Sequence, residues 1–188
     1  VGAGTGEFLK VCKNNSWNVF GTEPDNDARN IAIKKGIVLE KDISKFSTQK
    51  FEIITLWHVL EHVENLSEYI SNLNNMLSDF GRLIIAVPNF KSEDAKYYKE
   101  FWAAFDVPRH LWHFSQQSIH TLFLNERMLV EKTIPMKYDS YYVSLLSEKY
   151  KNGKINYMKA LFRGFISNWK ARTSSEYSSL IYVIKKQN

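Results

Sequence analysis

The hydrophobic pattern alternates between two periods along the first half of the chain. Short apolar runs of the kind found in buried strands occur at 17–23, 37–42, 51–59 and 82–88. Between them, apolar residues recur at helical spacing, over 8–12, 25–36 and 66–77. Strands that alternate with helices through short joints predict an α/β fold, with a parallel sheet covered on both faces and right-handed crossovers.

This rhythm breaks after Pro88. Residues 90–114 are rich in aromatic side chains and unlike a regular crossover helix, so we expect an insertion that faces the substrate. Helical spacing resumes after Ser115, and closing strands are expected at 128–136 and 178–186. Between them, residues 140–175 are expected to form a second insertion or lid. No repeat or long linker divides the chain, which predicts a single domain over 1–188.

Three glycines spaced one residue apart open the chain, in "VGAGTGEFLK". Glycine lacks the Cβ atom that limits tight turns and close ligand approach, so this spacing before a helical pattern predicts a ligand-cradling loop. In an open α/β sheet, such a loop leaves the carboxyl end of a central strand. No strand precedes Val1 here, and we therefore expect further residues upstream of it.

Composition narrows the class of protein. The 188 residues are 44% hydrophobic and 24% charged, which suits a folded domain with a substantial core. The single cysteine, Cys12, excludes an internal disulfide framework and suits a reducing compartment, so a cytoplasmic location is expected. The net charge of +5 is mostly interspersed and does not indicate nucleic-acid binding. No apolar run approaches the roughly 18 residues that span a bilayer.

Polar groups suited to a nucleoside follow the expected strands. The carboxylate of Glu23 can accept both hydroxyls of a ribose, and that of Asp42 can accept a hydrogen bond from an adenine amino group. Residues 56–58 end the next strand, where they could form a flat or apolar wall. The third glycine falls one residue earlier than in the dinucleotide fingerprint G-x-G-x-x-G, which leaves a nicotinamide oxidoreductase as the less favoured alternative.

In their order and spacing, "VGAGTGEFL", "GTEPD", "EKDI", "FEIITLWHVLEHV" and "LIIAVPN" resemble the motif series of class I S-adenosylmethionine-dependent methyltransferases. "DVPRHLWHFSQQSI" is similar to bacterial members of the group that includes quinone-ring O-methyltransferases. The resemblance implies a Rossmann-like fold with a mostly parallel seven-stranded sheet. It also implies methyl transfer from S-adenosylmethionine to oxygen or carbon of a small-molecule acceptor. A domain that binds the cofactor without catalysis is the alternative.

The same resemblance assigns the cofactor contacts by position. The residues implied are Gly2, Ala3, Gly4, Thr5 and Gly6 for the methionine part, Glu23 and Pro24 for the ribose, Asp42 and Ile43 for the adenine, and Leu56, Trp57 and His58 for the flank. The chain lacks the Asn-Pro-Pro-Tyr type of motif that amino-methylating nucleic-acid enzymes carry after the fourth strand, which disfavours methylation of a base.

Two histidine motifs carry candidate chemistry. "HVLEH" contains His58, Glu61 and His62 and fits the H-x-x-E-H zinc-peptidase signature, but it lies where these methyltransferases commonly have "LEHV". Some quinone O-methyltransferases hold a divalent cation there with Glu-x-x-Glu-His. Since His58 replaces the first glutamate and magnesium prefers oxygen ligands, no metal is expected.

Catalytic side chains are expected from "PRHLWHF". A histidine of ordinary pKa suits a general base for a phenol or alcohol acceptor. His110 is the first candidate, Arg109 would orient an acidic acceptor, and His62 is a further candidate. The alternative is that these residues brace the insertion against the sheet.

The C-terminal third carries a basic amphipathic segment. Residues 149–172 include seven basic side chains and no acidic one. One helical face collects Ile155, Met158, Leu161, Phe162, Phe165, Ile166 and Trp169. We expect a lid helix packed on the domain with its charged side in solvent. Contact with a membrane surface through 155–170 and a dimer contact are the alternatives, and the sequence does not indicate an oligomeric state.

Overall fold

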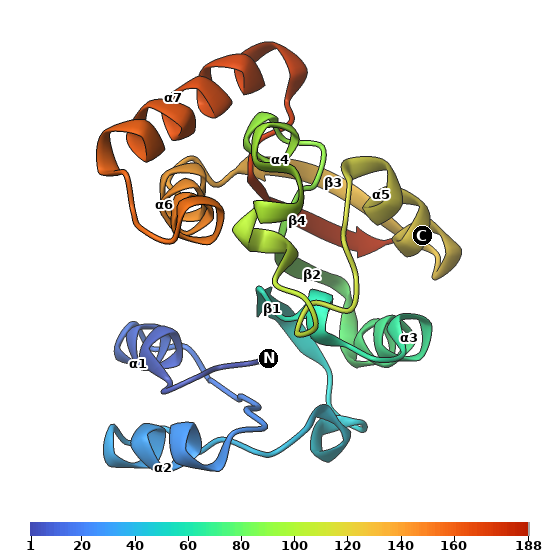
Figure 1. The fold of residues 1–188 in the computed structure, drawn as a ribbon. Coiled ribbons are helices and arrows are strands. Elements are labelled where there is room, and N and C mark those ends of the chain that lie inside the picture. Colours follow the sequence, from blue (N-terminus) through green and yellow to red (C-terminus); the bar gives the residue numbers. More distant parts are fainter. Residues whose placement is uncertain (188) are drawn as a thin grey trace.

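A mixed sheet of four strands forms the centre of the computed structural model, which describes residues 1–187 (Figure 1). The strand order is β1-β2-β4-β3. Strands β1 and β2 pair in parallel, whereas β4 is antiparallel to both of its neighbours. The strand bounds are β1 Phe51–Trp57, β2 Leu77–Pro88, β3 Met128–Pro135 and β4 Ser179–Lys186. The predicted α/β class is confirmed, but this described sheet is neither seven-stranded nor mostly parallel.

The difference arises at the N-terminal side of β1. Segments 17–23 and 37–42, expected as strands, pair with each other only through one parallel bridge, between Thr22 and Glu40, and form no ladder with β1. An apolar slot of about 290 Å³ separates 17–22 from β1. Its walls include Phe8, Trp17, Phe20, Ile53 and Trp57. These two segments therefore lie beside the sheet without joining its hydrogen-bond ladder.

Four helices follow the predicted periodicity, and they are α1 Glu7–Asn14, α2 Asn26–Lys34, α3 Leu66–Met76 and α5 Gln116–Asn125. Caps fix the starts of three of them, because the side chains of Asp25, Asn65 and Ser115 accept backbone N–H groups of the first turn. Helices α3 and α5 bury their apolar stripes in the main core against β2 and β4. Helix α3 ends at Met76, one residue before the end of the predicted helical pattern, because the chain becomes extended at the buried Leu77.

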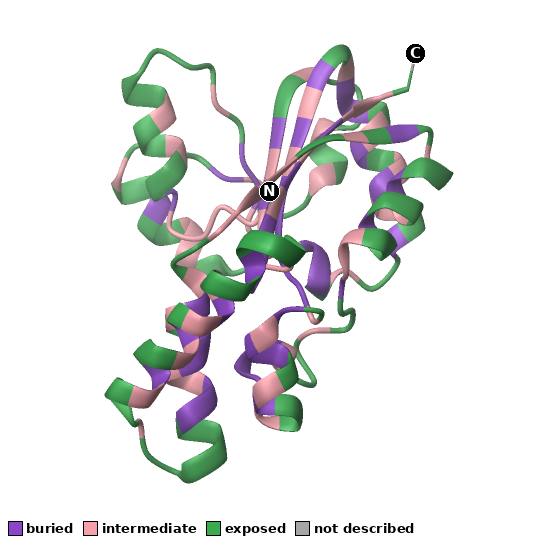
Figure 2. Cartoon of the chain, turned by 90° about the horizontal axis from the view of Figure 1, so that it is seen from above, coloured by how far each residue is buried: buried purple, intermediate pink, exposed green. Residues whose placement is uncertain are grey.

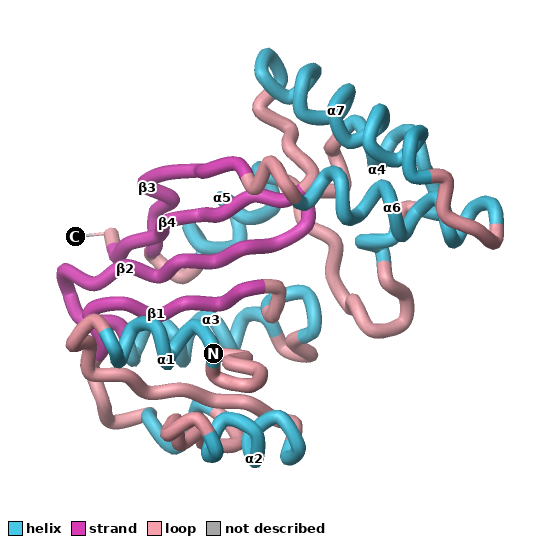
Figure 3. The backbone as a smooth tube through the Cα atoms, turned by 90° about the vertical axis from the view of Figure 1, so that its left-hand side faces the viewer, coloured by secondary structure: helices cyan, strands magenta, loops and turns pink. Residues whose placement is uncertain are grey.

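Three further helices gather beyond the carboxyl ends of β1 and β2 (Figure 3). They are α4 Glu93–Tyr98, α6 Asp139–Asn152 and α7 Tyr157–Ser174. Short 3₁₀ turns complete the chain at Ile43–Phe46, Leu60–His62, Lys99–Phe101 and Ala103–Phe105. Tyr98, Trp102 and Val143 form a second core between the two segments that were expected to be insertions.

Helix α7 is oriented against expectation. Its small residues face inward, with Ala160, Gly164, Ser167 and Ala171 all buried. A Cβ atom at Gly164 would lie 2.7 Å from the Tyr141 ring, so glycine permits this close approach. The large apolar side chains therefore remain exposed, as on much of the outer surface in Figure 2. The expectation of an apolar face packed on the domain was wrong. No helix within residues 1–187 is long and apolar enough to cross a membrane.

Candidate functional site

The glycine loop has a backbone that other residues would rarely adopt. Gly2, Gly4 and Gly6 have φ angles of 63°, 53° and 77°. The loop is anchored by a hydrogen bond of 2.9 Å from Ala3 N–H to the carbonyl of Thr22. A Cβ atom at Gly2 would lie 2.4 Å from the Val59 side chain, whereas one at Gly4 would meet nothing within 4 Å. Gly2 thus allows contact with the segment after β1, and the backbone at Gly4 is open to a ligand.

Glu23 is fixed directly beside this loop. Its Oε2 accepts the Gly4 N–H at 2.8 Å, and its Oε1 accepts the Asp25 N–H at 3.0 Å. The carboxylate is thereby oriented while retaining acceptor capacity for further donors. Two neighbouring backbone carbonyls accept hydrogen bonds from basic side chains. Lys35 donates to the carbonyl of Thr5, and Arg29 donates to that of Pro24.

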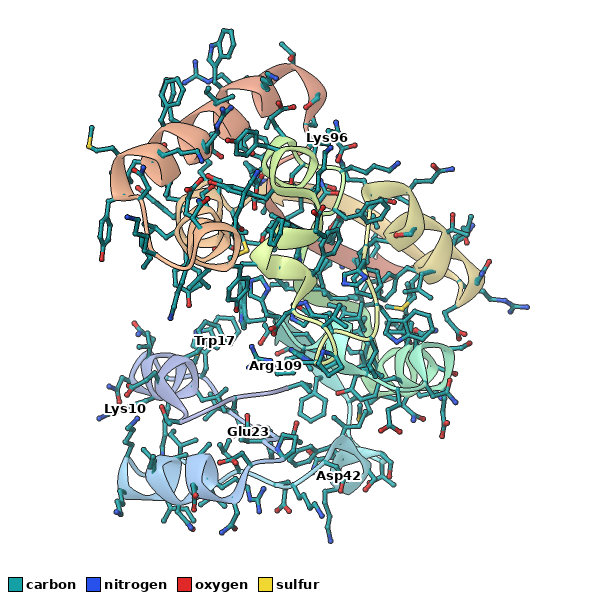
Figure 4. All side chains as sticks on the ribbon, viewed as in Figure 1. Lys10, Trp17, Glu23, Asp42, Lys96 and Arg109 are labelled. Atoms are coloured by element: carbon teal, nitrogen blue, oxygen red, sulfur yellow. The ribbon has the colours of Figure 1, made fainter. Side chains whose placement is uncertain are left out.

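Asp42 lies at the same edge as Glu23, because the parallel bridge aligns the ends of their two segments. Figure 4 labels both carboxylates on the part of the chain below β1, with Arg109 above them. Asp42 Oδ1 accepts the Ser44 N–H at 2.9 Å. With Ile43, Asp42 lines a cavity of about 590 Å³ that reaches Asn65, the N-cap of α3.

The expected wall after β1 is divided between two environments. Leu56 is fully buried in the main core, so its side chain does not face the glycine loop. Trp57 packs edge-on against Phe8 of α1, with ring centroids 5.9 Å apart, and lines the apolar slot. Alternation along a strand sends these neighbours to opposite faces, which explains why both cannot cover one ligand with their side chains.

His58 lies between two carboxylates, one on Glu61 and one on Asp139 of α6. Its backbone has a φ of 53°, its Nδ1 lies 3.2 Å from Glu61 Oε1, and its Nε2 lies 3.4 Å from Asp139 Oδ2. Burial disfavours the charged ring, but the hydrogen bonds and charges of Asp139 and Glu61 outweigh burial and raise the pKa of His58 to about 9. The contact between His58 and Asp139 therefore connects the residue after β1 to the start of α6.

Replacing Asp139 by asparagine is expected to lower the pKa of His58 by about 1–2 pH units, because one of its two anionic partners is lost. The folded-state pKa of about 9 exceeds the ordinary 6.5, so this ion pair stabilises the fold fully below pH 6.5, and the benefit is lost as the pH rises through about 9. NMR titration of the ring and thermal unfolding across this window test it. The exposed Asp27→Asn variant is the control, and an unaltered His58 titration in Asp139→Asn would contradict the assignment.

The structure brings His62 and His110 together from distant segments. Their ring centroids lie 4.7 Å apart at an interplanar angle of 75°. His62 Nδ1 lies 2.9 Å from the Arg109 carbonyl and His110 Nδ1 lies 2.8 Å from the Ala104 carbonyl, so each Nδ1–H donates and each Nε2 keeps its lone pair. Burial lowers the pKa of His110, which favours the neutral base.

Backbone contacts hold the loop of the "PRHLWHF" motif against the segment after β1. The N–H of Leu111 donates to the Glu61 carbonyl at 2.8 Å, and the Trp112 indole donates to the Val63 carbonyl at 2.7 Å. The guanidinium of Arg109 donates to Asp106 at 2.7 Å and is 73% exposed, so its remaining N–H donors are accessible to an incoming anion. The loop thus places an exposed cation beside the histidine pair.

Glu61 is the site residue that sequence reasoning missed. Its side chain is 1% exposed, and its Oε2 is buried without a hydrogen-bond partner. Glu61, His62 and His110 offer ligand atoms within 4.8 Å of one another, so they could hold a divalent cation that accepts imidazole ligands, such as Zn²⁺. The sequence signal for Glu61 was present in "HVLEH", but nothing in the sequence linked it to His110 or linked His58 to Asp139.

An open α/β sheet with a glycine loop and ordered carboxylates at its carboxyl edge is typical of proteins that bind a nucleoside cofactor. Residues 1–126 match the family model described as a methyltransferase domain. The chain belongs to this family, and it is a methyltransferase that uses S-adenosylmethionine. Comparison with curated protein sequences finds no significant match.

Solved structures share the fold at low sequence identity. A methyltransferase from Thermotoga maritima superposes with a TM-score of 0.63 and 16% identity, over 100% of this chain and 80% of that one. Magnesium protoporphyrin IX methyltransferase from Synechocystis, solved with S-adenosylhomocysteine, gives 0.63 and 15% over 98% and 71%. The cyclopropane synthase MmaA2 from Mycobacterium tuberculosis gives 0.67 and 10% over 99% and 76%.

Proposed function

We propose that the enzyme methylates an oxygen or carbon atom of a small-molecule acceptor, held between the glycine loop and the histidine pair. The observation that carries this proposal is the arrangement of His62 and His110, whose Nδ1 atoms lie at backbone carbonyls while neither Nε2 atom is within hydrogen-bond distance of a protein group among residues 1–187; the nearest carboxylate oxygen to His110 Nε2 is Asp106 Oδ2, at 3.8 Å. Val59 connects the two halves of the site. Gly2 packs against its side chain, and His62, which contacts His110, follows three residues later in the chain. The acceptor then lies at the carboxyl edge of the sheet.

Each residue has a distinct task in this proposal. S-adenosylmethionine supplies an electrophilic methyl group, and the protein holds the acceptor in line for displacement. His110 Nε2 takes the proton of a hydroxyl acceptor, and Arg109 orients an acidic acceptor. His62 packs edge-on against the His110 ring and holds it in position. Segments 90–114 and 140–175 supply the acceptor-side walls within a single domain over 1–188. The interspersed charge supports a metabolite rather than a nucleic acid as acceptor.

The cofactor contacts are proposed from the same edge. Residues 2–6, whose backbone is open at Gly4, face the methionine part, Glu23 and Pro24 the ribose, and Asp42 and Ile43 the adenine. Trp57 and the backbone of residues 56–58 complete the flank. Support comes from the carboxylate of Glu23, which is already oriented at 2.8 Å from the Gly4 N–H and so needs no rearrangement to receive hydroxyl donors.

We also propose that the complete sheet has seven strands. A parallel strand leading into Val1 fits the apolar slot between 17–22 and β1. Val1 supports this placement because its amino nitrogen donates to the Thr55 carbonyl of β1 at 2.9 Å. With that strand, segments 37–40 and 17–22 would extend the four-stranded sheet to seven strands, five of them in a parallel run from 37–40 to β2.

Replacing Glu23 by glutamine is expected to weaken S-adenosylmethionine binding by about 10–100-fold, because a charged acceptor for the ribose hydroxyls is lost. Isothermal titration of the full chain with S-adenosylmethionine, S-adenosylhomocysteine and NAD measures it. The control is Glu52→Gln on the exposed side of β1, which should bind like the native protein. Native binding of NAD alone, or equal affinity in Glu23→Gln, would contradict the proposed cofactor site.

A further inference from the structure

One side of α7 exposes an apolar surface that the fold does not use. The outer face of α7 consists of side chains between 49% and 80% exposed, namely Tyr157, Met158, Leu161, Phe162, Phe165 and Trp169. They recur at helical spacing along one side, and the small residues of the packing side lie elsewhere on the helix. The helix is thus held to the protein by small residues and presents its large apolar residues to solvent.

Positive charge surrounds this face. Residues 149–175 contain seven basic side chains and no acidic one. Four have partners on other helices: Lys159 with Glu148, Lys170 with Glu93, and both Arg163 and Lys151 over the Tyr97 ring. The others are exposed and carry no salt bridge within residues 1–187, namely Lys149, Lys154 and Arg172. The exposed apolar side chains of α7 therefore occur together with unpaired cations at the end of α6, in the α6–α7 connection and near the end of α7.

We propose that the outer face of α7 binds the surface of an anionic lipid bilayer, with the helix axis parallel to the membrane. A helix of 18 residues is about 27 Å long, and α7 fulfils the requirements for interfacial binding, an apolar side with basic residues at its border. Tyr157 and Trp169 stand near its two ends, and such side chains favour the membrane–water interface.

A bilayer explains the charge pattern better than a second copy of the chain. In a two-fold dimer the same patch meets itself, so the unpaired cations of both copies would approach each other without acidic partners. An anionic membrane offers hydrocarbon to the apolar side chains and negative headgroups to the cations.

Vesicle binding by the full chain tests this surface without reference to turnover, so its outcome is independent of the proposed activity. The probes are vesicles of phosphatidylcholine and of equal amounts of phosphatidylcholine and phosphatidylglycerol. We expect sedimentation with the mixed vesicles, about tenfold weaker binding to the neutral ones, and weakening by salt. The double variant Phe162→Ser/Phe165→Ser should bind the mixed vesicles at least about tenfold more weakly.

A matched control comes from Phe80→Ser. Phe80 is 87% exposed and lies near the N-terminal end of β2, whereas the helices α4, α6 and α7 lie beyond its carboxyl end. This variant should bind vesicles like the native protein. Because all three phenylalanines are exposed, the variants should keep the native thermal midpoint. Absence of vesicle binding by the native chain, equal binding by the double variant, or self-association that depends on Phe162 and Phe165 without vesicle binding would overturn the proposal.

Discussion

Replacing His110 by alanine is expected to lower the rate of methyl transfer by about 10²–10⁴-fold, the usual contribution of a positioned general base. S-adenosylmethionine affinity should stay at the native value, because His110 lies on the acceptor side and makes its hydrogen bond to the Ala104 carbonyl. The rate is measured as S-adenosylhomocysteine release, on the hydroxylated aromatic compound that the native enzyme turns over fastest in a screen.

His113 provides a matched control from the same loop. Its Nε2 lies 3.0 Å from the Phe105 carbonyl and its ring packs edge-on against Phe105, so His113→Ala removes a bracing histidine. If both variants lose the same activity, the histidines brace the loop and neither is the base. Selective loss in His110→Ala, with native cofactor affinity, supports the base.

The pH dependence follows from the same residue. Burial lowers the pKa of His110 below its ordinary value of 6.5, so the neutral base persists at neutral pH. The rate should therefore hold steady at neutral pH and fall only below 6.5 as His110 becomes protonated.

Since Glu61, His62 and His110 could also hold a cation, treatment with a chelator separates the two roles. Unchanged turnover fits the base, and lost turnover restored by Zn²⁺ indicates a metal site.

The α/β order was readable from sequence because periodicity reports which face of each element is buried. The stripe of α3 and the apolar runs of β1 and β2 all reach the main core. The extent of the sheet was not readable, because strand pairing depends on neighbours in space. Segment 17–22 has the composition of a strand, yet no described segment lies between it and β1 to complete the ladder.

Local motifs indicated that the glycine loop and Glu23 are neighbours, whereas contacts between distant segments could not be predicted from the sequence. The glycine loop and Glu23 lie together as their positions after consecutive elements indicated. Alternation along a strand places Leu56 and Trp57 on opposite faces, but which of the two faces the main core depends on how the strand packs in the sheet. The partnership of His58 with Asp139 joins segments far apart in the chain, and no local pattern encodes it.

Orientation of α7 was also beyond sequence reasoning. A hydrophobic stripe normally predicts the buried side, but packing density can favour small residues where two helices approach closely. Gly164 against Tyr141 is such a contact. The stripe was correctly located on one side of the helix, and it was assigned to the wrong environment.

A buried carboxylate joins this helical cluster to the sheet. Asp94 is 2% exposed, and its Oδ2 accepts from the Trp102 indole at 2.8 Å and from the Ser178 hydroxyl at 2.7 Å. Its Oδ1 accepts from the Ser167 hydroxyl of α7 at 2.6 Å. One side chain of α4 therefore connects α7, the second core and the residue before β4.

Replacing Asp94 by alanine is expected to lower the free energy of unfolding by about 3–5 kcal/mol, because three buried donors lose their acceptor at about 1–3 kcal/mol each and relax in part. Urea unfolding followed by circular dichroism measures it. The neighbouring Glu93→Ala removes only the partly exposed ion pair with Lys170, and should cost no more than about 1 kcal/mol. A loss in Asp94→Ala no larger than that of the control would contradict the network.

A double-mutant cycle separates the hydrogen bond from mere packing. If Asp94 stabilises α7 through the Ser167 hydroxyl, Ser167→Ala should cost less in the Asp94→Ala background than in the native chain, by about 0.5–3 kcal/mol. Additive losses would mean that the carboxylate holds only Trp102 and Ser178. Coupling would show that the position of α7, and with it the exposed apolar face, is set by a buried polar contact, since the packing side of this helix offers only small side chains.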